Sequence, residues 1–200
     1  MRTDLAAPVG LVSALPYNRA GAALRREIAW LQHRADPAVS PAPREPIPPE
    51  HDPAFEALSF YIIADQRVVS YAAVVYITIR HAGEPLTAAG LSCVATDPAY
   101  RRHGLGSLVV AAATRSILDS TVDLGLFTCD PPLTPFYERA GGWQVVPDVV
   151  LLGNQRPDAL TSVGLGKAVL MRLVSNRAQR MAPALEHAVI DLNLPPGQFV

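Results

Sequence analysis

The stretch TDPAYRRHGLGSLVV, residues 96–110, places two arginines, a histidine and two glycines between a segment typical of a strand and one typical of a helix. Their spacing is Arg101-x-x-Gly104-x-Gly106. At a helix start the first amide groups lack partners within the helix, and the helix dipole adds about half a positive charge there. Glycines let the backbone close around an oxyanion. The stretch therefore predicts an anion site, although glycines that open a helix often have a purely structural purpose.

This spacing matches neither of two common nucleotide-binding motifs. The sequence contains no G-x-x-x-x-G-K-[ST] stretch, and no G-x-G-x-x-G followed by an acidic residue about 20 residues later at a strand end. We therefore exclude P-loop nucleotide binding and Rossmann-type dinucleotide binding.

The two cysteines, Cys93 and Cys129, each stand inside an apolar segment. A thiolate with a lowered pKa is a competent nucleophile for an acetyl-enzyme, whereas a buried thiol is the commoner state of a free cysteine. Neither cysteine belongs to a C-x-x-C pair, and the five histidines show no ligand spacing, so no metal site is predicted. This cysteine usage is typical of a reduced cytoplasm.

Composition and charge narrow the classes of partner. The formal net charge is −1 and the basic residues are scattered, so neither nucleic acid nor an anionic membrane surface is an expected partner. No apolar run approaches the roughly 20 residues of a spanning helix, and the first residues do not form a signal peptide. Half of the 200 residues are apolar, enough for one domain with a sizeable core.

Hydrophobic periodicity predicts the elements that position the anion site. Leu24, Ile28 and Leu31 predict an amphipathic helix over residues 20–34. The proline-rich segment 36–53 is expected to be extended, either as a linker or as a lid over a site. Further elements are predicted in this order: antiparallel strands over 58–65, 68–79 and 87–96, a helix over 105–120, a parallel strand over 122–129, a short helix ending at Gly141 and Gly142, strands over 144–152 and 166–174, a helix over 176–185 and a strand over 187–194.

This order of elements, with the motifs VATDPAYRRHGLGSLVV and LFTCDPPLTPFYERAGGW, resembles the GCN5-related N-acetyltransferase (GNAT) superfamily over roughly residues 58–152. The resemblance implies an α+β fold with a mixed, mostly antiparallel central sheet, a splayed parallel strand pair and flanking helices. It implies a single acetyltransferase domain over residues 1–200, in which 36–53 is a proline-rich loop and 153–200 a C-terminal extension.

The resemblance also implies acetyl-CoA as co-substrate, bound where the parallel strands splay. Its pyrophosphate would lie on the amides of residues 102–107, and its pantetheine arm would pair with the backbone of residues 94–96. The expected cofactor-binding residues are Val94, Ala95, Thr96, Arg101, Arg102, His103, Gly104, Leu105, Gly106 and Ser107.

Tyr137 matches the superfamily tyrosine placed near the thioester sulfur. With a reference pKa of about 10 it stays protonated at neutral pH, and full proton transfer to a thiolate of pKa about 8.5 is uphill by about 2 kcal/mol. Tyr137 is therefore expected to hydrogen-bond the leaving thiolate. The alternative is a tyrosine that only packs in its short helix.

A general base is harder to assign, because the strand segment GLSCVAT holds Ser92 but no carboxylate. Ser92 with a water relay, and Asp130 just beyond the parallel strand, complete the expected catalytic set with Tyr137. Asp130 serves equally well as a helix N-cap. Glu84 on the HAGEP turn, and Glu45 or Glu50 if the proline segment folds over the site, are further carboxylates expected near the acceptor.

The predicted function is acetyl transfer from acetyl-CoA to a primary amine of a small molecule, directly within a ternary complex. The histidine-alanine-glycine turn, the GLFTCD strand and the long C-terminal extension resemble the aminoglycoside 2′-N-acetyltransferase branch, and the last residues PPGQFV would then reach the acceptor site. A non-catalytic acyl-CoA sensor and a protein N-terminal acetyltransferase remain alternatives. A homodimer is also left open.

Overall fold

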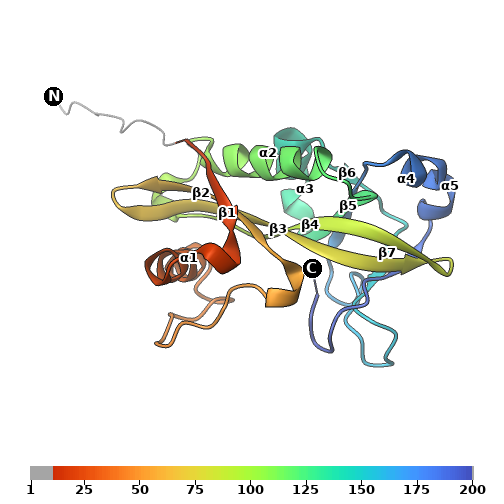
Figure 1. Cartoon of the computed structure of the whole chain (residues 1–200), viewed down its shortest axis with the longest axis horizontal. Helices are drawn as coiled ribbons and strands as arrows, with labels where there is room; N and C mark the ends of the chain where they lie inside the picture. Colours follow the sequence, from red (N-terminus) through yellow and green to blue (C-terminus); the bar gives the residue numbers. More distant parts are fainter. Residues whose placement is uncertain (1–10, 200) are drawn as a thin grey trace.

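The computed structural model describes residues 11–199, in which one mixed sheet is flanked by helices on both faces (Figure 1). The main strand order is β1-β2-β3-β4-β5-β8-β6, and β9 pairs with β3 and β7. The strand bounds are β1 Ser13–Pro16, β2 Leu58–Ala64, β3 Arg67–His81, β4 Glu84–Thr96, β5 Leu124–Cys129, β6 Gln144–Val145, β7 Val150–Leu152, β8 Ala168–Leu173 and β9 Val189–Asp191.

Two longer helices cover opposite faces of the sheet, because each has one apolar stripe to bury. Helix α1 buries Ile28 and Leu31 against one face, and α2 buries Val109 and Ile117 against the other. In Figure 1, α2 and α3 lie above the sheet and α1 lies below it. The helix bounds are α1 Ala22–Ala35, α2 Leu105–Leu118, α3 Thr134–Gly141, α4 Asn176–Arg180 and α5 Ala182–Leu185.

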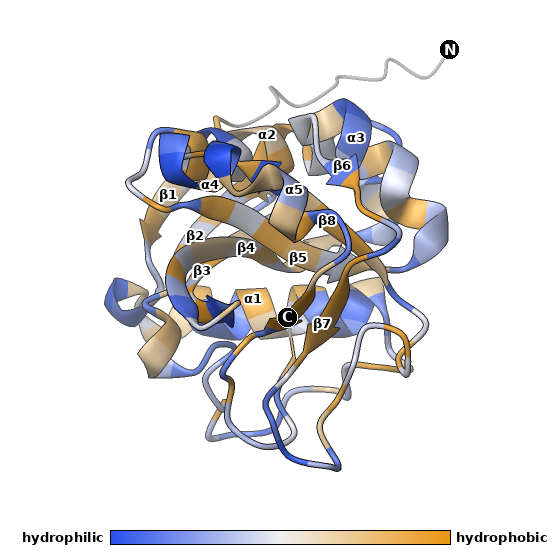
Figure 2. Ribbon diagram, turned by 90° about the vertical axis from the view of Figure 1, so that its right-hand side faces the viewer, coloured by the Kyte–Doolittle hydropathy of each residue, from blue (hydrophilic) through white to orange (hydrophobic). Residues whose placement is uncertain are grey.

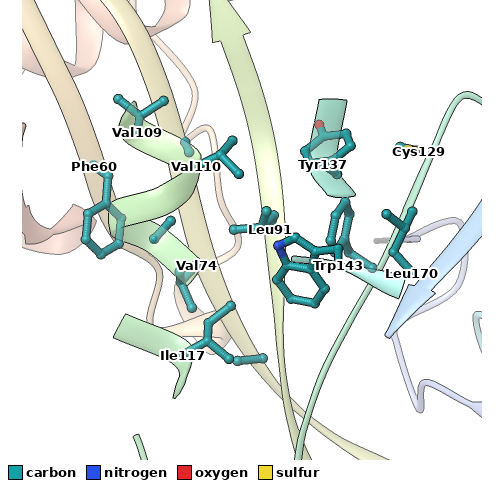
Figure 3. Packing of buried hydrophobic residues seen from close by; sticks show 14 of the residues in the cluster. Phe60, Val74, Leu91, Val109, Val110, Ile117, Cys129, Tyr137, Trp143 and Leu170 are labelled. Carbon is teal, nitrogen blue, oxygen red and sulfur yellow. The ribbon is translucent and has the colours of Figure 1, made fainter. Parts of the chain in front are cut away.

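The core on the α2 side also contains α3. Trp143 follows α3, is fully buried, and donates its indole N–H to the Thr114 hydroxyl at 2.9 Å. Figure 3 shows Tyr137 and Trp143 in the same packed cluster as Leu91 of β4 and Leu170 of β8. Figure 2 shows hydrophobic residues along the central strands and hydrophilic residues on the outer surfaces of the helices. The packing therefore holds α3 against the junction of β4 and β5.

Strands β4 and β5 are parallel but pair over only two positions, Ala88 with Leu124 and Ala89 with Gly125. After Gly90, β4 continues beside β3 and β5 continues beside β8. A Cβ atom at Gly90 would lie 2.5 Å from the Leu126 carbonyl oxygen, so the point of divergence tolerates only glycine. The α+β fold with a splayed parallel pair is confirmed.

Three predictions about the second half of the chain are wrong in detail. The strand expected over 144–152 is two strands, because β6 pairs with β8 whereas β7 pairs with β9. The helix expected over 176–185 is interrupted at Met181, just before Pro183 in the first turn of α5, where the proline ring cannot donate a hydrogen bond. The last strand covers only Val189–Asp191.

Two N-terminal features were less visible in the sequence. Strand β1 was not predicted, because four residues are too few to show an alternating pattern. Residues 36–52 form neither helix nor strand and run beside α1, to which they are tied by an ion pair between Arg26 and Glu45 at 2.6 Å. Within residues 11–199, no helix is long and apolar enough to cross a membrane.

Candidate active site

The turn between β4 and α2 is anchored by a side chain expected to bind the cofactor. The Arg101 guanidinium donates to the Thr96 carbonyl at 3.2 Å and to the Ala35 carbonyl, at the end of α1, at 2.8 Å. Carbonyls at a helix C-terminus lack partners within the helix. The Arg101 side chain therefore holds the turn against α1.

The backbone of this turn opens α2 with free amide groups. Arg102 has a φ of 65° and Gly104, the N-cap of α2, a φ of 79°, while no side chain caps the helix. The turn borders a cavity of about 390 Å³ whose lining includes Thr96, Gly106 and Ser107. His103 is exposed on the same turn. These features fit the phosphates of a nucleotide-bearing co-substrate.

Arg139 lines the same cavity from α3 and was missed by the sequence reasoning. It lies in the FYERAGGW motif two residues after Tyr137, but only the packing of α3 against α2 brings it beside Arg102 at the cavity. The two guanidinium groups add positive charge where a pyrophosphate would lie.

A bulge in β4 marks the site where the strands diverge. Ala73 pairs with Ser92 and Tyr71 pairs with Ala95, so Cys93 and Val94 together face one residue of β3. Cys93 has a φ of 51°, unusual for a residue with a side chain. A bulge leaves part of the backbone unpaired, and an unpaired backbone amide is a suitable hydrogen-bond donor for a carbonyl oxygen that gains negative charge.

Tyr137 lies on the α2 side of this junction and is 6% exposed. Its ring packs edge-on against Phe127 of β5 and against the adjacent Phe136, with centroids 4.9 Å apart in both cases. Burial raises its pKa well above the usual value, and the nearby Cys129 and Asp130 raise it further. Tyr137 therefore stays protonated and able to donate a hydrogen bond at neutral pH.

Neither cysteine is activated as a nucleophile. Burial raises the pKa of Cys93 to about 12 and that of Cys129 to about 11. The Ser92 hydroxyl lies 3.5 Å from the Cys93 sulfur, and the Cys129 thiol is directed at the Asp130 carbonyl at 3.3 Å. Both thiols thus remain protonated, which disfavours an acetyl-enzyme.

The carboxylates expected around the acceptor do not form one cluster. Asp130, at the end of β5, is exposed, caps no helix through its side chain, and forms an ion pair with Lys167 at 2.6 Å. Glu84 forms an ion pair with Arg177 at 3.2 Å and begins β4 at the hairpin. Nine residues of strand separate Glu84 from Cys93, about 30 Å along an extended chain.

Glu50 is the carboxylate that the proline segment brings to the bulge. It is partly buried with its carboxyl group near the Cys93 thiol, and its burial raises its pKa. Glu45, earlier in the same segment, is instead held by Arg26 on α1. Only its position in the fold distinguishes Glu50 from Glu45, so the sequence could name both but not choose between them.

Comparison with known proteins agrees with this geometry. The family model described as the acetyltransferase (GNAT) family matches residues 25–142. A search of curated proteins found no match. Among solved structures, the Escherichia coli GNAT family N-acetyltransferase YhbS in complex with CoA is 18% identical, with a TM-score of 0.59 over 96% of this chain and 94% of that one.

Two further structures are similar. Escherichia coli ElaA is 13% identical, with a TM-score of 0.54 over 80% of this chain and 97% of that one. A probable N-acyltransferase from Enterococcus faecalis V583 is 19% identical with a TM-score of 0.49, and the match covers 68% of this chain but only 32% of that longer one. At these identities the two Escherichia coli structures show the shared fold.

The family model covers more than half of the chain, from within α1 to Gly142, the residue that ends α3. This chain therefore belongs to the acetyltransferase (GNAT) family, a family of acyltransferases whose co-substrate is acetyl-CoA.

Proposed function

We propose that the chain transfers the acetyl group of acetyl-CoA to a primary amine of a small molecule, directly within a ternary complex. The observation that carries this proposal is the divergence of β4 and β5 next to the β4 bulge, with the protonated Tyr137 packed on one side of it. The proposal takes residues 1–200 as one acetyltransferase domain, with 36–53 as a loop and 153–200 as a C-terminal extension.

In this proposal the pyrophosphate lies on the free amides at the start of α2, between Arg102 and Arg139, and Arg101 keeps the turn in place. The pantetheine arm enters the gap between β4 and β5 and pairs with the edge of residues 94–96. No β5 residue pairs with this edge, because residues 95 and 96 pair with β3 on their other side and β5 has already turned towards β8. The Thr96 carbonyl on it accepts from Arg101. The side chains thus position the cofactor and leave its thioester at the bulge.

Tyr137 donates a hydrogen bond to the sulfur as the C–S bond breaks. Its high pKa keeps the proton on the phenol, so it stabilises the thiolate without becoming charged. Ser92 and water relay the proton of the attacking amine, and Asp130 at the end of β5 attracts cationic acceptors. The ion pair with Lys167 reduces the charge that Asp130 offers.

The resemblance to aminoglycoside 2′-N-acetyltransferases adds amino sugars to the acceptors that we propose to test. The C-terminal tail approaches the proline segment, since the Gln198 amide donates to the Asp52 carboxylate at 3.1 Å. The last residue of the expected PPGQFV contact, Val200, lies outside the described residues. A chain that only senses acyl-CoA would bind the cofactor but release no thiol with any amine.

The test is release of CoA thiol from acetyl-CoA in the presence of a panel of small amines, amino sugars and N-terminal peptides. We expect turnover with small amines and loss of it in Tyr137→Phe. Cofactor binding without turnover across the panel would favour the sensor. Asp130→Asn should raise KM for cationic acceptors and spare neutral ones, and an equal response to both would remove Asp130 from the acceptor site.

A further inference from the structure

A large cavity lies between α1 and the proline segment, on the opposite face of the sheet from α2 and α3. Its volume is about 870 Å³, and it is lined by residues of segment 39–50 together with Ala29 and Gln32 of α1. This volume is within the usual range for a site that encloses a small molecule, about 300–1,000 Å³.

Two of the residues that line the cavity lie next to the β4 bulge. Gln32 lines the cavity and donates its side-chain amide to the Cys93 carbonyl at 2.8 Å. Glu50 also lines it, and its carboxyl group lies near the Cys93 thiol. The cavity therefore borders the β4 bulge.

Glu50 and Tyr137 approach this point from opposite faces of the sheet. Cys93 packs with the cluster that contains Ile28 of α1, whereas the next residue, Val94, packs with the cluster that contains Tyr137. An acyl group in the gap between β4 and β5 would thus have the tyrosine on one side and the carboxylate on the other. The amine adds to one face of the thioester carbonyl, so this arrangement lets a base act on the amine and a hydrogen-bond donor act on the thiolate without interfering with each other.

We infer that the acceptor amine enters through the cavity between α1 and the proline segment, and that Glu50 accepts its proton at the β4 bulge. This inference rests on the proposed N-acetyltransferase function. Glu50 supplies the carboxylate that β4 itself lacks and accepts the first proton of the amine, so the relay through Ser92 and water is left to carry the second.

The proton balance is complete with the groups named. The ammonium form gives one proton to the Glu50 carboxylate, and the resulting neutral amine forms the C–N bond with the acetyl carbon. The C–S bond breaks, a second proton from the nitrogen ends on the CoA thiolate, and Glu50 releases its proton to solvent. A carboxylate whose pKa is raised by burial holds a proton better than an exposed one, so it suits this role.

A buried polar cluster positions Glu50 although its segment has no regular structure. The Glu50 amide donates to the Tyr17 hydroxyl at 2.9 Å. The next residue, His51, is 5% exposed and hydrogen-bonded to the Tyr71 hydroxyl at 2.9 Å, which in turn lies 3.0 Å from the Ser59 hydroxyl. The Tyr17 and His51 rings also pack edge-on at 5.0 Å. We call Tyr17, His51, Ser59 and Tyr71 the clamp, and its members act as positioning residues.

The lining of the cavity indicates the class of acceptor. Three charged residues are among those that line it: Arg44, Glu45 and Glu50. Glu45 is paired with Arg26, so Glu50 is the carboxylate that we assign to the acceptor. Five prolines form much of the wall and offer no N–H donors. We expect a small amine with one ammonium group and an apolar body, and a weaker fit for a polycation such as an aminoglycoside.

The first experiment compares Glu50→Gln with Glu186→Gln, which removes an exposed carboxylate at the end of α5 and serves as the control for charge. We expect Glu50→Gln to lower kcat by about 10²- to 10⁴-fold, with acetyl-CoA affinity by calorimetry unchanged. Its profile of kcat/KM against pH should also lose the acidic limb of the wild type. Glu186→Gln should behave as wild type.

The failure of each idea gives a different result. If no amine releases thiol with the wild-type chain, the proposed function fails. If the wild type turns over and Glu50→Gln keeps its rate and its acidic limb, Glu50 is not the proton acceptor. If polycationic amines have lower KM values than singly charged ones, the assigned acceptor class is wrong.

Tyr17→Phe tests the clamp, since it keeps the ring against His51 and removes the hydroxyl bound to the Glu50 amide. We assign the acidic limb of kcat/KM against pH to the titration of Glu50. The other titratable groups near Glu50 are Tyr17, Tyr71, Cys93 and His51, and Arg25 lies beside Tyr17. We expect a fall in kcat and a shift of the acidic limb in the folded variant. A variant with reduced stability but an unchanged pH profile would show that the clamp is only structural.

Discussion

Arg34, in the last turn of α1, and Asp97, directly after β4, form an ion pair with 2.6 Å between Nε and Oδ2. Their side chains are 19% and 10% exposed. Arg34 also donates to the Val68 carbonyl at 3.0 Å, and Asp97 accepts from the Ala99 amide at 3.0 Å. The pair therefore joins α1 to the turn that leads into the cofactor site.

Removal of one partner should destabilise the fold. Arg34→Met leaves the Asp97 carboxylate in a largely buried place without its cation, and we expect a loss of about 3 kcal/mol in the free energy of unfolding. Urea denaturation measures it. The double variant Arg34→Met with Asp97→Asn should recover part of the loss, and additive effects would show that the two residues do not interact.

Gly104→Val should weaken acetyl-CoA binding by about tenfold or more, because a side chain at positive φ costs about 1–2 kcal/mol and would stand where the cofactor phosphates approach. Gly83→Val is the matched control. Gly83 also has a φ of 79°, and a Cβ atom there would meet nothing within 4 Å, but it lies on the distant hairpin turn. Calorimetry measures the affinity of each variant for acetyl-CoA, and only Gly104→Val should bind it more weakly. Equal affinities would place the pyrophosphate elsewhere.

Tyr137→Phe should lower kcat by roughly 10- to 1,000-fold and leave cofactor affinity nearly unchanged, because the hydrogen bond forms mainly as charge develops on the sulfur. The phenyl ring keeps its packing against Phe127 and Phe136. Steady-state rates of thiol release and calorimetry give both quantities. Wild-type turnover in the variant would reduce Tyr137 to a packing residue.

Stability should fall in mild acid because of His51. Burial lowers its pKa from 6.5 to about 4. A histidine whose pKa is lower in the folded state stabilises the fold fully above pH 6.5, and this contribution is lost as the pH falls towards 4. The contribution of His51 to the free energy of unfolding that is lost in this way is about 3 kcal/mol.

His51→Gln should remove this part of the acid sensitivity. Urea denaturation at about pH 7 and about pH 4.5 gives the loss of stability in each protein, and the loss should be smaller in the variant. Because both proteins share all other titrating groups, the difference between them isolates His51. Identical losses would mean that His51 is not buried in its neutral form.

Local patterns in the sequence predicted the order of elements from α1 to α3, because each of these elements carries its own signal. Leu24, Ile28 and Leu31 have helical spacing, and the strands are β-branched runs bounded by turns. The turn at Gly104 and the tyrosine at Tyr137 were recognisable for the same reason, since each lies within a short continuous motif. Their roles in cofactor binding and catalysis stay predictions.

Local patterns did not predict contacts between segments that are distant in the sequence. Residues 144–152 form two strands because β6 pairs with β8 and β7 pairs with β9. No residue within the segment indicates which strand it will pair with. Likewise, the sequence did not show that Arg101, which lines the cavity, is also held by a carbonyl at the end of α1. Nor did it show that the packing of α3 on α2 brings Arg139 to the cavity.

The place of Glu50 shows the physical reason most clearly. A proline-rich segment has no periodic apolar face, so its sequence does not indicate the surface against which it packs. Its position comes from hydrogen bonds to Tyr17 and, through His51, to Tyr71, which stand 33 and 20 residues away along the chain. The sequence therefore identified the residue types at the site. Long-range packing determined which carboxylate lies at the β4 bulge.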